Sequence, residues 1–479
     1  MTDKAPPPLA VLPQAELHED LVADVVPEAV VDELEVIEVD EHNRQDRLLA
    51  PGARQRRRLP TALVTTPESL SLLLSRDDAR ELFASLRLVV VDEWHELMGS
   101  KRGVQVELAL SRLKTVSPAL KVWGISATIG NMEQALEALL GDYFHKGNFK
   151  VIRADIQKHV EIISVLPDSL ERMPWAGHLG IQLLEKVIEI VRKSNSTLIF
   201  TNTRSFAEIW YQRMLDMAPE FSGLMAMHHG SISQELRSWV EDQLHQGKLK
   251  AVVCTSSLDL GVDWGDIDCV VQMGAPKGSS RLLQRIGRAN HRLDTPSRAI
   301  LVPGNRFEFL EASAAKDAVD QGQRDGEDFR PGGLDVLAQH VMACACAAPF
   351  DEKALLAEVR SSLAYSWLEE SVWGRVLHFV ATGGYALEAY DKFKRIVRDR
   401  AGTWRLAHPE QAQRHRMNAG IIVDAEMIEI RFRNGRSLGK VEEQFAASLR
   451  NGDTFRFAGM DLEVESFKDL DLIVRAAKS

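Results

Sequence analysis

The chain of 479 residues has few cysteines, no long apolar run and no secretion signal. Because no run of about 18 apolar residues occurs, a membrane-spanning helix is excluded. The N-terminus lacks a basic segment followed by an apolar one, so we expect no secretory signal peptide. Four cysteines are too few for a disulfide framework, and Cys344 and Cys346 fall on different faces of a predicted helix, which argues against a zinc site. These absences favour a reduced, cytoplasmic protein.

The net charge of −11 is confined to the N-terminal segment. Residues 1–46 hold 13 acidic and two basic side chains, and the rest of the chain holds 56 of each kind. A body that is neutral overall can still carry local basic grooves, so the acidic total does not exclude a nucleic-acid partner. The segment shows no partner strand and no helix cap. We therefore predict that residues 1–51 form a disordered acidic leader.

From Pro60 to about Glu311, short β-branched runs alternate with amphipathic stretches, which predicts a parallel sheet wrapped by helices. The predicted strands are Ala62–Val64, Leu88–Val91, Val122–Ile125, Thr197–Phe200, Met225–Met227, Ala251–Cys254, Cys269–Gln272 and Ala299–Val302. The predicted helices are Val104–Leu113, Met132–Leu140, Gly180–Arg192, Phe206–Leu215, Gln234–Leu244 and Ser280–Gly287. Between them, Asp142–Lys150 is typical of a domain linker.

The pattern changes after this region. Residues 334–400 are predicted to be mostly helical, with a break at Gly383. From Gly420 the apolar residues alternate with a period of two, and turn signals such as Asn434-Gly435 separate the runs. This part of the chain therefore predicts an antiparallel sheet or barrel.

Two carboxylates follow the predicted buried strand Leu88–Val91, at Asp92 and Glu93. In open α/β sheets, ligands lie beyond the carboxyl ends of the strands. An Asp at this place can hold Mg²⁺ on the phosphates of a nucleotide, and the adjacent Glu can orient and deprotonate an attacking water. An Asp-Glu pair after a strand also serves as a helix N-cap, so the segment alone leaves both interpretations open.

A second polar segment, Ser126-Ala127-Thr128, follows the predicted strand Val122–Ile125. If the two strands are neighbours, their polar ends lie side by side, and the hydroxyls of Ser126 and Thr128 can bond to the carboxylates. Ser-Ala-Thr alone is a weak signal because it can cap any helix. The ordered pair DEWH and SAT is much more specific.

Two further segments carry groups suited to phosphates and ribose. Arg288 and Arg292 lie four residues apart and would share one face of a helix, where guanidinium groups can neutralise charge on a transferring phosphoryl group. A solvated basic face is the alternative. After the strand Ala251–Cys254, Gly261 permits a tight turn, and Asp263 could accept bonds from a ribose or order the arginines.

Together these segments resemble the DEXH-box helicases of superfamily 2. The matching segments are TTPESL (Thr65–Leu70), DEWH (Asp92–His95), SAT (Ser126–Thr128), IFTNTR (Ile199–Arg204), HHG (His228–Gly230), TSSLDLGVDWG (Thr255–Gly265) and QRIGRANHR (Gln284–Arg292). Two later segments, HRMNAGIIVDAEMIEIRF and GRSLGKVEEQFAASLRNGDTFRFAG, narrow the resemblance to Lhr-type helicases, and the ligase-associated DEXH-box group is the nearest likeness.

The resemblance implies a fold of tandem RecA-like parallel sheets, the first of them incomplete, followed by a helical winged-helix module and an antiparallel β-barrel-like module. The implied domains are a partial first RecA-like domain at 52–145, a second at 150–311, the winged-helix module at 312–407 and the barrel-like module at 408–479. It also implies ATP-dependent 3′-to-5′ translocation on DNA in repair, with Mg²⁺ as the metal. Single-stranded or partly duplex DNA is the expected partner, together with a repair nuclease or ligase.

The resemblance also assigns roles to residues. The catalytic residues would be Asp92, Glu93, His95, Gln284, Arg288 and Arg292, with Mg²⁺ held near Asp92 through the nucleotide. Gly261, Asp263 and Arg285 would bind ATP, and Ser126 and Thr128 would couple its hydrolysis to movement. The nucleic acid would be contacted by Thr65, Thr66, Glu68, Thr201, Asn202, Arg204, His229 and Thr255.

Softer candidates lie elsewhere in the chain. The basic residues are Arg54, Arg56, Arg57 and Arg58, and, on a predicted helix, Lys392, Lys394, Arg395 and Arg398. They offer phosphate contacts, with solvated charge as the alternative. The aromatic residues Trp367, Trp373 and Phe379 have roughly helical spacing, and we expect them in the core.

One family feature is missing. The sequence contains no G-x-x-x-x-G-K-[ST] phosphate loop, and its Gly-Lys pairs at Gly247 and Gly439 lack the following Ser or Thr. We expect an N-terminally truncated member whose leader lies outside the family, and a first sheet that leaves the strand Leu88–Val91 with an unsatisfied edge. Two alternatives remain open, an ATPase-dead DNA-binding remnant and an RNA-directed helicase.

Overall fold

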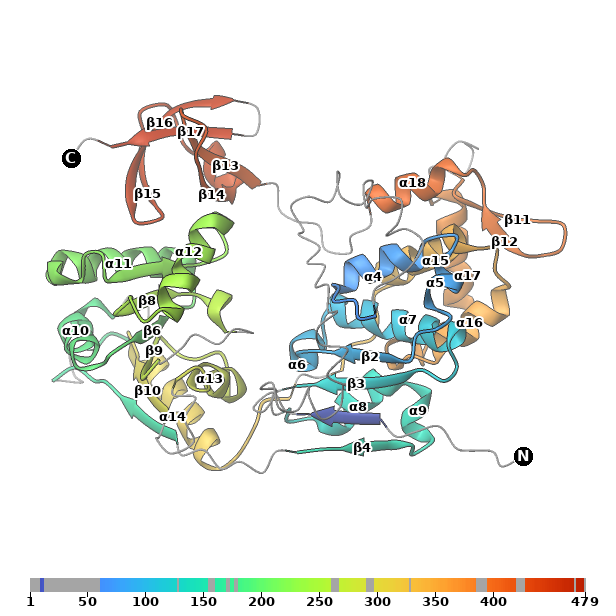
Figure 1. Cartoon of the computed structure of the whole chain (residues 1–479), viewed down its shortest axis with the longest axis horizontal. Helices are drawn as coiled ribbons and strands as arrows, with labels where there is room; N and C mark the ends of the chain where they lie inside the picture. Colours follow the sequence, from blue (N-terminus) through green and yellow to red (C-terminus); the bar gives the residue numbers. More distant parts are fainter. Residues whose placement is uncertain are drawn as a thin grey trace. The chain divides into compact units, whose positions relative to one another are not determined.

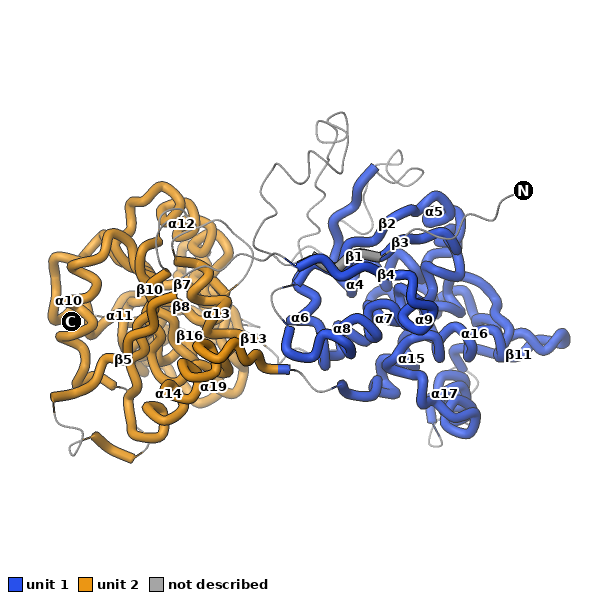
Figure 2. Tube along the Cα trace, turned by 90° about the horizontal axis from the view of Figure 1, so that it is seen from below, with its two compact units in different colours: residues 1–155, 326–423 blue, residues 156–325, 424–479 orange. Residues whose placement is uncertain are grey.

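The computed structural model describes most of the chain after residue 60. The described residues are 9–12, 61–126, 129–153, 160–168, 173–175, 180–259, 267–289, 297–326, 329–384, 394–418, 427–468 and 471–477. They form two compact units, residues 1–155 with 326–423 and residues 156–325 with 424–479 (Figure 2). Among the described residues, no helix is both long enough and apolar enough to cross a membrane.

Unit 1 is built on a four-stranded parallel sheet in the order β2-β3-β1-β4 (Figure 1). Its elements are β1 (Leu9–Leu12), α4 (Pro67–Leu74), α5 (Ala79–Phe83), β2 (Leu88–Val91), α6 (Trp94–Leu97), α7 (Lys101–Val116), β3 (Lys121–Ile125), α8 (Met132–Leu140), α9 (Asp142–His145) and β4 (Phe149–Val151). The strand β1 comes from the leader that we predicted to be disordered. For these four residues the prediction is wrong, because β1 pairs with both β3 and β4 and lies between them.

The first sheet differs from the prediction at three more places. We expected β2 to be fully buried, but Leu88 is 37% and Val90 46% exposed, because β2 ends the sheet order and, among the described residues, pairs with β3 alone. Residues 62–64 do not form the predicted strand and lead instead into α4. The predicted linker Asp142–Lys150 contains α9 and most of β4, so it belongs to this unit.

A helical module completes unit 1. Its elements are α15 (Leu334–Ala347), α16 (Glu352–Arg360), η7 (Leu363–Tyr365), α17 (Glu370–Thr382), β11 (Ile396–Arg398), β12 (Trp404–Leu406) and α18 (Glu410–Met417). Three helices followed by a two-stranded antiparallel hairpin form a winged-helix arrangement. Val104 and Leu108 of α7 enter the apolar core of this module, which joins it to the first sheet.

The surface of the helical module corrects two predictions. Arg398 lies in strand β11 and not on a helix, while Lys394 and Arg395 precede that strand. Trp373 is buried as expected, but Trp367 and Phe379 are 41% and 55% exposed. Lys392 and the basic cluster at residues 54–58 lie outside the described residues.

Unit 2 is built on a six-stranded parallel sheet in the order β5-β10-β9-β6-β8-β7. Its elements are β5 (Val160–Ser164), η4 (Ile181–Leu183), α10 (Leu184–Lys193), β6 (Thr197–Phe200), α11 (Arg204–Met217), η5 (Pro219–Phe221), β7 (Met225–His228), α12 (Gln234–His245), β8 (Ala251–Cys254), η6 (Ser256–Leu258), β9 (Cys269–Met273), α13 (Ser279–Ile286), β10 (Ser297–Val302) and α14 (Arg306–Asp320). The central strands are buried on both faces, as their continuous apolar runs require. The predicted module junction at residues 311–312 falls within α14.

The C-terminal part of unit 2 is a five-stranded sheet in the order β14-β13-β17-β16-β15. Its elements are β13 (Met427–Phe432), β14 (Ser437–Glu442), α19 (Glu443–Ala447), β15 (Thr454–Phe457), β16 (Met460–Lys468) and β17 (Asp471–Ala476). All pairs are antiparallel except β13 with β17. Alternate apolar residues such as Leu462 and Val464 form its core, as the period of two predicted.

A buried carboxyl links α7 to the helical module. Glu107 is 7% exposed and accepts a hydrogen bond from the N–H of Ala364 at 2.9 Å. Burial raises the pKa of Glu107 to about 8, although this hydrogen bond opposes the shift. In the unfolded chain the carboxyl loses its proton at its ordinary pKa, so the folded state loses relative stability between about pH 5 and pH 8.

We predict that Glu107→Gln flattens the dependence of the free energy of unfolding on pH in this range. Glutamine can accept the same hydrogen bond but does not titrate, whereas the wild-type carboxyl contributes a slope of up to about 1.4 kcal/mol per pH unit. Urea unfolding at pH 5, 6, 7 and 8 measures the slope, with Glu133→Gln on the exposed face of α8 as control. Equal slopes in both variants and the wild type would contradict the assignment.

Candidate functional site

The carboxyl ends of β2 and β3 lie side by side, as predicted, because the two strands pair in parallel. Asp92 is exposed directly after β2, and its carboxylate accepts a hydrogen bond from the N–H of Glu93 at 2.8 Å. Trp94 is almost fully buried and donates its indole N–H to the carbonyl of Ala135 on α8 at 2.8 Å. Sequence reasoning gave Trp94 no role, yet it fixes the turn that carries the two carboxylates.

Glu93 has an unusual backbone conformation. Its φ of 48° and ψ of 41° lie in the left-handed region, where a side chain with a Cβ is strained. It occupies the N-cap position of α6, but its side chain makes no capping hydrogen bond. Strain of this kind persists where the surrounding structure imposes it, and it is concentrated at functional sites. The Glu93 side chain therefore does not act as a helix cap, although the residue occupies the N-cap position.

His95 connects the two strand ends. Its Nδ1 atom lies 3.5 Å from a carboxylate oxygen of Glu93 and 3.2 Å from the hydroxyl of Ser126, which follows β3. We expected the hydroxyl of Ser126 to bond to a carboxylate, but it contacts this imidazole. The second expected coupling residue, Thr128, lies outside the described residues. The arrangement gives a continuous polar contact from Glu93 through His95 to the neighbouring strand.

The first-unit candidates for nucleic-acid contact are mostly engaged within the protein. The hydroxyl of Thr66 caps α4 by accepting the N–H of Ser69 at 3.2 Å. Glu68 is held by both arms of the Arg102 guanidinium, at 2.8 and 3.2 Å. Burial alone would raise the pKa of Glu68. The hydrogen bonds from Arg102 and the backbone have the larger combined effect, so the pKa of Glu68 lies below its ordinary value. Thr65 is half-buried beside this cap.

In unit 2, three predicted contact residues follow three adjacent strands. Thr201, Thr255 and His229 come directly after β6, β8 and β7, and the backbone N–H of Thr255 donates to the carbonyl of His228 at 3.2 Å. The parallel sheet thus brings them to one edge. Thr255 is half-buried, but Thr201 is 1% exposed and its hydroxyl donates to the carbonyl of Cys254 at 3.1 Å. Thr201 therefore supports the edge and does not present its hydroxyl to a ligand.

Two of the predicted contact residues hold the C-terminal sheet. Arg204 pairs with Glu442 at the end of β14 at 2.8 Å and also donates to Ser231. His229 is 1% exposed, and its Nε2 lies 3.2 Å from the carboxylate of Glu208 on α11. Both side chains are thus engaged within the unit, and their predicted contact with DNA stays a prediction.

Glu208 carries the rest of this attachment, and sequence reasoning missed it. Its carboxylate accepts the backbone N–H groups of Ala458 and Gly459, at 2.7 and 3.0 Å, in the turn between β15 and β16. Both turn residues have positive φ, 51° and 74°, which directs their N–H groups to one acceptor. Together with the imidazole of His229, the carboxylate thus receives three polar contacts. The C-terminal sheet is therefore docked firmly on the second parallel sheet.

Arg285, which we predicted to bind ATP, is engaged within the protein, and its role in ATP binding stays a prediction. It is 3% exposed and donates to both oxygens of Asp259, at 2.8 and 3.1 Å. It also donates to Gln272 on β9 and stacks 4.7 Å from the ring centre of Phe200. These contacts occupy the guanidinium within the sheet. Arg285 is a structural link between α13, β9 and the segment after β8.

The remaining residues of this motif are only partly described. Helix α13 ends at Ile286, so Arg288 lies in the turn that follows the helix. Gln284 and Arg288 are half-buried. Arg292, Gly261 and Asp263 lie outside the described residues. Asn202 is half-buried at the same edge and donates its amide to the carbonyl of Ala275 at 3.0 Å.

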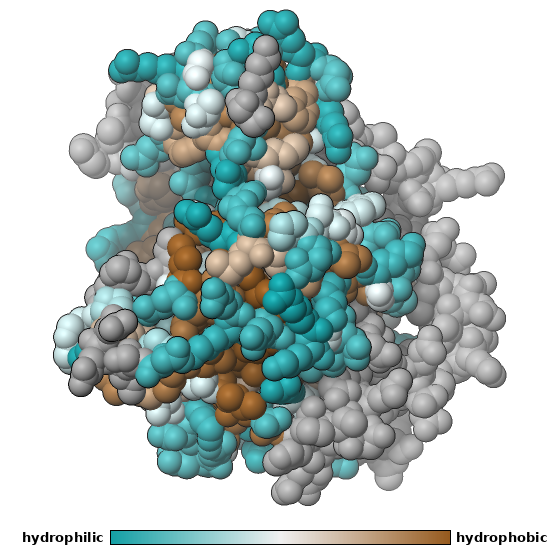
Figure 3. Space-filling model, turned by 90° about the vertical axis from the view of Figure 1, so that its left-hand side faces the viewer, coloured by the Kyte–Doolittle hydropathy of each residue, from teal (hydrophilic) through white to brown (hydrophobic). Residues whose placement is uncertain are grey.

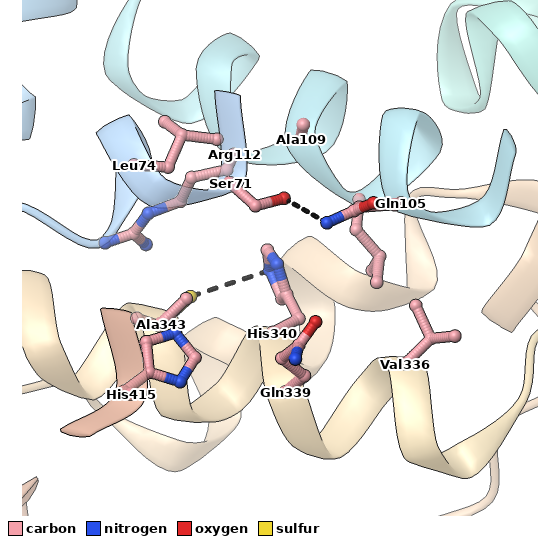
Figure 4. A pocket seen from close by; sticks show the side chains of 12 residues that line it. Ser71, Leu74, Gln105, Ala109, Arg112, Val336, Gln339, His340, Ala343 and His415 are labelled. Atoms are coloured by element: carbon pink, nitrogen blue, oxygen red, sulfur yellow. Dashed lines mark hydrogen bonds between the residues drawn. The ribbon is translucent and has the colours of Figure 1, made fainter. Parts of the chain in front are cut away.

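A cavity of about 20 Å³ with both polar and apolar lining residues lies inside unit 1 between α4, α7, α15 and α18 (Figure 4). His340 projects from α15 toward α7, 3.5 Å from the thiol of Cys344. These two residues and Glu358 place possible metal ligands within 4.8 Å of one another. His340 and Cys344 are four residues apart on one helix, a pairing that we did not predict from the sequence. Arg112 already pairs with Glu358 at 3.1 Å, and its positive charge opposes a cation there. We assign the cluster to helix packing.

Because Glu93 adopts a left-handed conformation, glycine should be better tolerated there than alanine. We predict that Glu93→Gly is more stable to urea unfolding than Glu93→Ala by about 1 kcal/mol. The same pair at Glu96, inside α6, should show the opposite order, because glycine destabilises a helix by about 1 kcal/mol relative to alanine. The same order at both positions would contradict the conformation assigned to Glu93.

We also predict that Arg285→Ala lowers the free energy of unfolding by about 3–5 kcal/mol, because it leaves the carboxylate of Asp259 buried without its bidentate partner. Arg281→Ala is the matched control. Its guanidinium lies 3.9 Å from the same carboxylate but is 34% exposed, so its loss should cost about 1 kcal/mol or less. Urea unfolding of both variants measures the difference. Equal stabilities would mean that Arg285 is not the structural link described here.

Comparison with known proteins agrees with this architecture. Family models match at residues 2–135 (DEAD/DEAH box helicase), 181–292 (helicase conserved C-terminal domain) and 317–479 (large helicase-related protein, winged helix domain). The first match begins at residue 2, so it includes the leader that we expected to lie outside the family.

Individual relatives carry the same description. The chain is 34% identical over 414 residues to the ATP-dependent helicase Lhr-Core of Methanothermobacter thermautotrophicus, covering 85% of this chain and 48% of that protein. It is 30% identical to the Lhr helicase/probable uracil glycosylase of Mycolicibacterium smegmatis, covering 82% and 28%. The chain thus spans about half the length, or less, of these curated relatives.

A solved structure extends the likeness to the fold. The Mycobacterium smegmatis helicase Lhr bound to ssDNA and AMP-PNP is similar with a TM-score of 0.69 and 29% identity, covering 88% of this chain and 56% of that one. The helicase MrfA bound to DNA shares the fold with a TM-score of 0.69 at 18% identity. The matched models, the relatives and the paired strand ends together show that the chain belongs to the Lhr-type DEXH-box helicases.

Proposed function

We propose that the chain carries the water-activating and strand-contacting residues of an ATP-dependent Lhr-type helicase of the ligase-associated kind, and that by itself it binds single-stranded DNA with only trace ATP hydrolysis. The observation that carries this proposal is the strained Glu93 beside Asp92, joined through His95 to the end of the neighbouring strand. A carboxylate held in this way is suited to act on water. The link to β3 gives a route by which a change at Glu93 reaches the rest of the sheet.

The residues of unit 1 fit a nucleotide-bound Mg²⁺ ion. Asp92 is exposed at the carboxyl end of β2, and a carboxylate is the ligand type that Mg²⁺ prefers. The ion would be held near Asp92 and would neutralise charge on the phosphates of ATP. Glu93, largely shielded from solvent, would orient the attacking water and accept its proton. His95 would keep the Glu93 carboxylate in place.

The second parallel sheet would supply positive charge and grip. Arg288 and Arg292 are proposed to face the phosphates, with Gln284 beside them, and Gly261 and Asp263 to lie near the nucleotide. Arg285 is left out because its guanidinium is occupied by Asp259. For the strand, Asn202 and Thr255 at the edge of the sheet would hold phosphates without reading bases. Thr65 would contribute from the first sheet.

The phosphates of ATP lack one usual partner. A phosphate loop supplies a nest of backbone N–H groups and a lysine, and the sequence contains no such motif. The residues that would hold Mg²⁺ and activate water thus fit the reaction, but the sequence offers no phosphate loop to cradle the β- and γ-phosphates. We therefore propose that this chain binds single-stranded DNA but hydrolyses ATP only at trace rates. This is the DNA-binding alternative raised by the sequence.

The wider role is also a proposal. The relative of known structure was solved with ssDNA and a nucleotide analogue, which supports DNA as the partner here. The resemblance to the ligase-associated group supports a role in DNA repair, movement in the 3′-to-5′ direction and a repair nuclease or ligase as partner. The motifs act on phosphates and do not distinguish DNA from RNA, so the choice of sugar is decided by experiment.

We predict that the full chain binds labelled single-stranded DNA with an affinity that falls as salt rises, and that its ATP turnover with Mg²⁺ and DNA does not exceed that of Glu93→Gln. A steady-state ATPase assay and fluorescence anisotropy at two salt concentrations measure the two parts. Robust DNA-stimulated hydrolysis that Glu93→Gln abolishes would refute the claim of trace turnover.

The DNA assignment has its own control. Matched DNA and RNA oligonucleotides of one sequence are compared under the same salt conditions. A clear preference for RNA would replace DNA by RNA in the proposal. Failure of the folded chain to bind either polymer at low salt would overturn the proposed function itself.

A further inference from the structure

Unit 2 exposes a group of large apolar side chains near the start of α14. Figure 3, which views the molecule from the side of unit 2, shows hydrophobic patches among the hydrophilic side chains of that face. Trp175, Phe307 and Leu310 are 61%, 53% and 58% exposed. With Arg306 they form what we call the Trp175 patch. Isolated exposed apolar residues need no explanation, but two neighbouring aromatic rings do.

The two rings are held in a defined arrangement. The ring centres of Trp175 and Phe307 lie 5.8 Å apart with their planes inclined by 53°. The guanidinium of Arg306 lies 4.8 Å from the ring centre of Trp175. The same arginine fixes the neighbouring backbone, because its main-chain N–H donates to the carbonyl of Pro174 and its Nε to that of Met173, both at 2.9 Å. The rings are therefore presented with little freedom left to lose on binding.

The patch lies at the same edge of the sheet as the strand-contact residues. Helix α14 begins just after the carboxyl end of β10, and β10, β9 and β6 are neighbours in the sheet. Glu308, next to Phe307, accepts the N–H of Gly304 at 2.7 Å, and its carboxylate flanks Gly274. The amide nitrogen of Asn202 lies on the same side, since a Cβ built on Gly274 would be 3.3 Å from it and 3.6 Å from both carboxylate oxygens of Glu308. Asn202 and Glu308 thus lie close together beside Gly274, and Phe307 precedes Glu308 in α14.

Two largely exposed aromatic side chains with a guanidinium against one of the rings suit a flat, electron-rich ligand near negative charge. A nucleobase has this character, because it stacks on aromatic rings regardless of its identity, and the phosphate beside it is attracted by arginine. The exposed Glu311, one turn after Phe307, disfavours a phosphate directly on the patch but not a base. The chemistry of the patch therefore favours base stacking over a purely ionic contact with the backbone.

We propose that Trp175 and Phe307 form a stacking platform for a base of the single strand held at this edge. The inference rests on the proposed function, because it extends the strand path from Asn202 toward α14. The contact is sequence-tolerant, and it gives affinity that does not depend on the release of counterions.

The test compares binding of a labelled oligo(dT) to the full chain and to Trp175→Ala, Phe307→Ala and Trp175→Phe. Each alanine variant should bind about 5- to 100-fold more weakly, the range that loss of one stacked base produces. Trp175→Phe should retain most of the affinity, because it keeps an aromatic face. Trp239→Ala is the matched control, since Trp239 is 53% exposed on α12, which packs beside β7 at the opposite end of the sheet order.

A second readout separates stacking from charge. The slope of log affinity against log salt should be unchanged in Trp175→Ala, because no phosphate contact is removed, whereas loss of a phosphate contact lowers it. DNA should quench the tryptophan fluorescence of the wild type and of Trp239→Ala. This quenching should be largely lost in Trp175→Ala. Because Trp175 is mostly exposed, its variants should unfold at the wild-type temperature.

The outcomes are distinct. If the wild type binds DNA and Trp175→Ala binds equally well with the same quenching, the platform is overturned while the proposed function stands, and the patch is then free to serve a protein partner. If the folded wild type does not bind single strands at all, the proposed function fails and the platform falls with it. Weakened binding with an unchanged salt slope and lost quenching supports the platform.

Discussion

Parallel strand pairing is the constraint on which both candidate sites depend. In unit 1 the register of β2 against β3 places the end of one strand beside the end of the other, so Glu93, His95 and Ser126 meet although 31 positions separate the last two. In unit 2 the same geometry gathers the residues that follow β6, β8 and β7. A one-residue change of register would move these side chains to the opposite face of the sheet.

The motif residues of unit 2 divide between support and presentation. Arg285 and Thr201 are buried and hydrogen-bonded within the unit, and the buried His229 contacts Glu208 through Nε2, while Asn202 and Thr255 are half-buried at the edge. This division has a physical cause. An edge that grips a charged polymer must itself be rigid, and rigidity in a polar region requires that the groups below the surface complete their hydrogen bonds. A motif therefore contains more residues than the ligand touches.

The order of strands and helices could be predicted from the sequence because the apolar runs of the central strands are short, β-branched and buried on both faces. Thr197–Phe200 and Ala251–Cys254 were predicted at their observed bounds. Ala62–Val64 failed because three apolar residues carry no information on whether a neighbouring strand is present. The strand β1 was missed because the strands that pair with it lie more than 100 residues later in the chain, so nothing local indicates it.

The site was predictable as a set of residues but not as a set of contacts. The strand ends at Asp92, Ser126 and Thr255 follow from the alternation of strands and helices, and DEWH with SAT indicated which pair to join. The partner of Arg285 was not predictable, because Asp259 lies 26 residues away and nothing local couples the two. Glu208 was missed for a similar reason, since its partners come 250 and 251 residues later.

The division of the chain into two units has a consequence for its synthesis and its breakdown. The chain passes between the units three times, and unit 1 includes residues 326–423 as well as residues 1–155. A ribosome must therefore release most of the polypeptide before the first unit can close its core around α7. A protease that cuts the chain at one of these three passages would leave the other two intact. The two units would therefore stay covalently linked after a single cut.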